Sequence, residues 1–60
     1  MIKALIIEDE SLIAKELQYK IKEITDDIEI IQILPSVKSA SKWFLENSEP
    51  DLIFADIQLS

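Results

Sequence analysis

Residues 4–10 read Ala-Leu-Ile-Ile-Glu-Asp-Glu, and residues 52–56 read Leu-Ile-Phe-Ala-Asp. In both stretches a short apolar run ends at acidic residues. Such runs are typical of strands buried on both faces, as in parallel sheets, which gather functional groups at the carboxyl ends of their strands. Neighbouring strands lie about 4.8 Å apart, so Glu8, Asp9 and Asp56 would repel one another unless a cation or a proton intervened. The pattern indicates a metal site, with a reactive aspartate as a further candidate.

The whole chain alternates between strand and helix patterns. Strands are predicted at Ile2–Ile7, Ile28–Leu34 and Leu52–Asp56, and helices at Ser11–Ile24 and Val37–Glu46. The β-α-β-α-β order predicts an α/β fold with a three-stranded parallel sheet and right-handed crossovers. With the strands in the order 2-1-3, the helices would cover opposite faces. The crevice would then lie between the first and third strands, beside the acidic residues.

Apolar spacing predicts which face of each helix packs on the sheet. In the first helix the expected inner stripe is Ile13, Leu17, Ile21 and Ile24, and in the second it is Val37, Ala40, Ser41 and Phe44. Ser36 is the expected N-cap of the second helix. Trp43 is expected to pack, whereas Leu12 and Tyr19 lie off the stripe, either exposed or against elements outside this chain.

Composition excludes several kinds of site. The 60 residues include no cysteine, histidine or glycine, which excludes disulfides, most zinc, copper and haem sites, and every glycine-rich phosphate loop. Hard cations with oxygen ligands remain. The net charge of −6 and the absence of a basic patch predict no direct nucleic-acid contact by these residues. No apolar run is long enough to span a membrane, and we expect a cytoplasmic protein.

The length predicts an incomplete domain, the first half of a larger one. A third strand ending near Ser60 would present a long apolar edge, which proteins normally cover or pair. We therefore expect a homodimer of the isolated chain, by strand pairing or by exchange of elements.

Two segments carry a resemblance to a known family. Ile2–Glu10 (IKALIIEDE), Pro50–Leu59 (PDLIFADIQL) and the spacing of Asp9 and Asp56 are similar to the receiver domain of two-component response regulators. The likeness covers the whole chain, 1–60, as a partial receiver domain. The sequences of both segments are most similar to receivers joined to a LytTR-type DNA-binding domain.

The resemblance implies a flavodoxin-like fold and a role in a phosphorelay. Asp56 matches the aspartate that takes a phosphoryl group from a sensor histidine kinase. Asp9 matches the direct Mg²⁺ ligand, Glu8 its acidic neighbour, and the backbone carbonyl of Gln58 the third protein ligand. Such a protein is a switch in signal transduction, and through an output domain in transcription regulation, rather than an enzyme. Its own chemistry is at most autophosphorylation and autodephosphorylation.

The departures from the family pattern concern the second half of the domain. Receivers carry a Thr or Ser on a fourth strand and a Lys on a fifth, and neither strand falls within these residues. We therefore expect this chain alone to be inactive, and DNA contact only through an output domain outside it.

Two other functions remain open at this point. A pseudo-receiver would use the same fold to bind a partner without phosphorylation, although the complete acid set Glu8, Asp9 and Asp56 argues against it. A Mg²⁺-dependent phosphohydrolase with an aspartate nucleophile usually has a second acid two residues after the first, where this chain has Gln58.

Overall fold

A computed structural model describes residues 1–55 of the chain, and the five elements follow one another as predicted. They are β1 (Ile2–Ile7), α1 (Ser11–Ile24), β2 (Ile28–Leu34), α2 (Val37–Glu46) and β3 (Leu52–Ala55). Asp56, which was predicted to end the third strand, lies outside the described residues.

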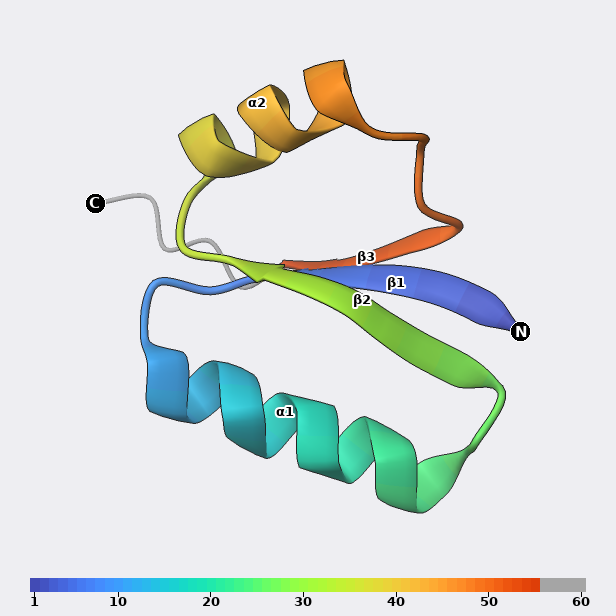
Figure 1. The fold of residues 1–60 in the computed structure, drawn as a ribbon. Helices are drawn as coiled ribbons and strands as arrows, with labels where there is room; N and C mark the ends of the chain where they lie inside the picture. Colours follow the sequence, from blue (N-terminus) through green and yellow to red (C-terminus); the bar gives the residue numbers. More distant parts are fainter. Residues whose placement is uncertain (56–60) are drawn as a thin grey trace.

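The strands form a single parallel sheet in the order β2-β1-β3, which confirms the predicted topology. The first and last parts of the chain are therefore neighbours, since β3 pairs with β1 rather than with the strand before it. α1 covers one face of the sheet and α2 covers the other, giving three layers (Figure 1). This arrangement is consistent with the first half of a flavodoxin-like fold.

The core is built around the central strand. Residues Ala4 to Ile7 of β1 are all buried, and Leu5 and Ile6 have no exposed surface. Successive side chains of a strand point to opposite faces, so a strand flanked on both edges and covered on both faces must be apolar throughout. This requirement explains the unbroken apolar run from Ala4 to Ile7.

On the α2 side, Leu5 and Ile7 pack with Leu34 and Ala40, and Ile31, Trp43 and Phe44 cover this cluster. The Trp43 and Phe44 rings meet edge to face, with centroids 5.8 Å apart. Trp43 is thus a packing residue, as predicted.

β2 contains an irregularity in its pairing with β1. Ala4 pairs with Ile30 but Leu5 pairs with Gln32, so Ile31 is an extra residue in the ladder. An extra residue of this kind reverses the alternation of side chains beyond it. Ile28 and Ile30 therefore face the α1 side, whereas Leu34 faces the α2 cluster.

The predicted inner stripe of α1 was wrong in part. The buried residues are Ala14 and Ile21, whereas Ile13 is 42% exposed and Ile24 is 83% exposed. The helix is rotated so that Ala14, the smallest side chain available, lies against the sheet, which lets the two approach closely. Ile24 is the last residue of the helix, where the chain turns toward β2. Leu12 and Tyr19 are exposed.

The predicted stripe of α2 was right for Ala40 and Phe44 and wrong for Val37 and Ser41. Val37 is 52% exposed and Ser41 is exposed, while Ala40, Trp43 and Phe44 contact the core. The Ser36 hydroxyl accepts a hydrogen bond from the Ser39 N–H (3.1 Å), which confirms the predicted N-cap. Of the helices in residues 1–55, neither has the length and apolar character that crossing a bilayer requires.

Candidate functional site

The carboxyl ends of β1 and β3 lie side by side at one edge of the sheet. Ile6 pairs with Phe54, and Ile7 pairs with Ala55. The acidic segment Glu8-Asp9-Glu10 follows Ile7 directly, and Asp56 follows Ala55 in the sequence. The sheet thus brings together the two chain segments from which the acids were predicted to converge.

Glu8 is held in place by the backbone around it. Its side chain is only 8% exposed, its N–H donates to the carbonyl of Leu34 (2.9 Å), and its Oε1 accepts from the Glu10 N–H (3.1 Å). The first bond extends the β1–β2 ladder by one residue, and the second closes the turn that leads into α1. Glu8 is therefore a fixed part of the site, because a carboxylate this buried requires hydrogen-bond donors.

Asp9 and Glu10 are exposed on the same turn. Ser11 begins α1 directly afterwards, and Glu10 occupies the N-cap position without a side-chain capping bond. Asp9 therefore projects from a short connection whose two ends are fixed by β1 and by α1. This is a suitable position for a ligand that must reach a cation from the solvent side.

The structure describes only part of the predicted metal site. Glu8 and Asp9 are described, whereas Asp56 and Gln58 lie outside the described residues. Within residues 1–55, no three acidic, histidine or cysteine side chains gather closely enough to hold a metal ion. The Mg²⁺ assignment to Glu8, Asp9, Asp56 and the Gln58 carbonyl stays a prediction.

One residue that fixes the sheet register was missed from the sequence. At the opposite end of β3, Asp51 makes two hydrogen bonds with the backbone of Lys3. The Lys3 N–H donates to Asp51 Oδ2 (3.0 Å), and the Asp51 N–H donates to the Lys3 carbonyl (2.8 Å). These bonds fix the register of β3 against β1. They lie four residues before the pair Ile7 and Ala55 at the carboxyl end of the two strands. The only signal for this role was the Pro-Asp pair directly before an apolar strand.

The comparisons with known proteins agree with this geometry. The chain is 37% identical over 60 residues to the sensory transduction protein LytT of Bacillus subtilis (strain 168), and the match covers 100% of this chain. No model of a protein family matches, and no solved structure matches. The similarity supports a response-regulator receiver-like region, so the resemblance noted from the sequence is confirmed. The chain spans 24% of the length of this relative.

We expect Asp51→Ala to loosen β3 without unfolding β1 and β2. The change removes the carboxylate acceptor for the Lys3 N–H but leaves the backbone bond in place. A hydrogen bond to a charged but exposed group stabilises by about 1 kcal/mol, so amide exchange in β3 should accelerate roughly five-fold. Hydrogen–deuterium exchange measures this, with Glu49→Ala as the control. Equal exchange in both variants would show that Asp51 does not set the register.

Proposed function

We propose that this chain carries the phospho-accepting half of a two-component receiver. In this proposal, Asp56 takes a phosphoryl group from a sensor histidine kinase, and Glu8, Asp9, Asp56 and the Gln58 carbonyl hold Mg²⁺. The observation that carries the proposal is the pairing of Ile7 with Ala55. Consecutive Cα atoms are about 3.8 Å apart, so the residues that follow this pair start from the same edge of the sheet.

The donor set suits a hard cation. All the proposed ligands are oxygen atoms, and Mg²⁺ prefers oxygen ligands and keeps several waters. Bound there, the cation would neutralise the carboxylates and the incoming phosphoryl oxygens. The buried and hydrogen-bonded Glu8 would act as a positioned acid, and the exposed Asp9 as the ligand that meets the ion from solvent.

The transfer itself needs one nucleophile and one leaving group. A carboxylate oxygen of Asp56 forms a bond to phosphorus as the bond between phosphorus and the kinase histidine nitrogen breaks. The nitrogen keeps the electron pair of that bond. Similarity to a sensory transduction protein supports a signalling role over a hydrolytic one.

The free edge of β3 supports a second copy of the chain as a partner. Leu52 is 40% exposed and Ile53 is 43% exposed, and within residues 1–55 this edge of β3 pairs with no strand. An apolar edge without charged residues invites pairing.

We expect Asp9→Asn to weaken Mg²⁺ binding by roughly ten-fold or more, because loss of even an outer partner of a metal ligand costs about that much. The same change in the intact protein should slow phosphorylation from a small phosphodonor. Mg²⁺ titration measures the effect, and Asp26→Asn removes an equal charge at the opposite end of the sheet as the control. Identical titrations for both variants would refute the ligand assignment.

Asp56→Ala in the intact protein should abolish phosphorylation, because it removes the only carboxylate that directly follows β3. Mass spectrometry after treatment with acetyl phosphate checks this, with Glu10→Gln as a control acid beside the site. A stable aspartyl phosphate at position 56 supports a receiver, and no label at all indicates a pseudo-receiver. Rapid turnover of many phosphate esters indicates a phosphohydrolase.

The 60-residue chain should sediment as a dimer at micromolar concentration, because pairing of two β3 edges would bury Leu52 and Ile53. Leu52→Lys, which places a charge on that edge, should shift the equilibrium toward monomer. A folded, purely monomeric wild-type chain would contradict this part of the proposal.

A further inference from the structure

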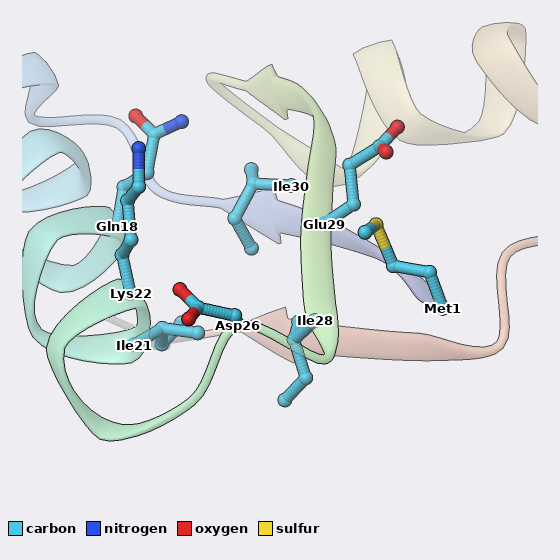
Figure 2. A pocket seen from close by; sticks show the side chains of 8 residues that line it. All are labelled: Met1, Gln18, Ile21, Lys22, Asp26, Ile28, Glu29 and Ile30. Atoms are coloured by element: carbon cyan, nitrogen blue, oxygen red, sulfur yellow. The ribbon is translucent and has the colours of Figure 1, made fainter.

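A cavity of about 320 Å³ opens between α1 and the start of β2, at the end of the sheet opposite the acidic residues. Figure 2 shows side chains of α1 on one side of it and those of β2 on the other. It is lined by Met1, Gln18, Ile21, Lys22, Asp26, Ile28, Glu29 and Ile30. The cavity therefore has no residue in common with the proposed phosphoryl site.

The cavity has an apolar floor and a polar rim. Ile21 is 7% exposed at its base, and Ile28 and Ile30 are half-buried beside it. Asp26, on the connection between α1 and β2, and Lys22 of α1 are exposed on the rim, whereas the exposed Glu29 side chain lies on the far side of β2 from α1 (Figure 2). Such a surface suits an aliphatic side chain in a segment that also carries a basic residue near Asp26.

The backbone of β2 adds unused hydrogen-bonding groups along this cavity. The Ile2 N–H donates to the Asp27 carbonyl (2.7 Å), and Lys3 of β1 lies opposite Glu29 of β2 in the ladder. Residues of a parallel strand direct their backbone groups alternately to one neighbour and to the other. Asp27 and Glu29 thus face β1, while the N–H and C=O groups of Ile28 and Ile30 face away from it. Among the strands in residues 1–55, β2 pairs only with β1.

We propose that this edge binds an extended peptide segment of a partner protein as an additional strand. The peptide's backbone would pair with Ile28 and Ile30, an aliphatic side chain would enter the cavity, and a basic side chain on the same face of the peptide would lie near Asp26. Strand addition to a free edge supplies affinity through the backbone and selectivity through alternate side chains. The extra residue at Ile31 ends the regular ladder, which limits the paired segment to a few residues.

The net charge of the chain favours a basic partner. The chain carries a net charge of −6, so a basic peptide is attracted and an acidic one is repelled. The pairing of the peptide with β2 does not involve Glu8 or Asp9. It is therefore a function beyond the proposed phosphoryl transfer.

A synthetic seven-residue peptide tests the proposal, with leucine at its centre, a valine on each side of it, an arginine outside each valine, and serine at both capped ends. Added at up to millimolar concentration to the ¹⁵N-labelled chain, it should shift the amide resonances of Ile28 to Ile30. The Trp43 indole, which packs on the opposite face of the sheet, should not move. No shifts, or shifts confined to other elements, would overturn the proposal.

N-methylation separates strand addition from simple filling of the cavity. Two variants of the peptide carry N-methyl groups on alternate residues, one on the odd positions and one on the even positions. A strand presents only one of these sets to β2, so one variant should bind as before and the other should lose binding. Equal binding by both variants would refute strand addition.

Charge reversal on the rim tests the partner's sign. Asp26→Lys should weaken binding about two- to five-fold, as expected for an exposed ion pair, and the loss should shrink at high salt. Glu46→Lys on α2 makes the same charge change elsewhere and should leave binding unchanged. Equal effects of the two changes would show only a general attraction and would overturn the assigned position.

Discussion

Parallel pairing of β1 on both of its edges is the constraint on which the rest of this structure depends. A strand paired on both sides and covered on both faces has no exposed position for a polar side chain, and Ala4 to Ile7 are accordingly all buried. Polar groups can appear only where the strand ends. The acidic turn therefore begins at Glu8, the first residue after the strand.

The same constraint explains why the two ends of the sheet differ. At the carboxyl end, the backbone of Glu8 continues the ladder to Leu34, so a carboxylate is drawn into a mostly buried position before α1 begins. At the amino end, Asp51 closes β3 onto Lys3 with its side chain and its N–H. One end thus fixes the register, and that register brings Ile7 and Ala55, the ends of β1 and β3, side by side at the other.

Much of this architecture could be predicted because each element carries its own local signal. The apolar run of β1, the Ser36 cap and the polar turns were sufficient to place the elements, and the alternating order was sufficient for the sheet. The rotation of α1 could not be predicted, because Ile13 and Ala14 are both apolar and periodicity cannot choose between them. The sheet prefers Ala14, a choice that depends on how closely the helix approaches. The bonds of Asp51 were missed for a related reason, since a side-chain contact across 48 residues leaves no local pattern.

The two edges of the sheet present different surfaces to a partner. The edge of β3 is short and uncharged, with Leu52 and Ile53 partly exposed, and we propose that it pairs with a copy that has a similar apolar edge. The edge of β2 combines acids with the irregularity at Ile31, and both features disfavour long, unselective strand pairing. What remains usable on β2 is the short stretch beside the cavity, where side-chain fit and charge decide which segment can bind. Because the proposed phosphoryl site lies at the other end of the strands from this cavity, a segment bound there would not block it.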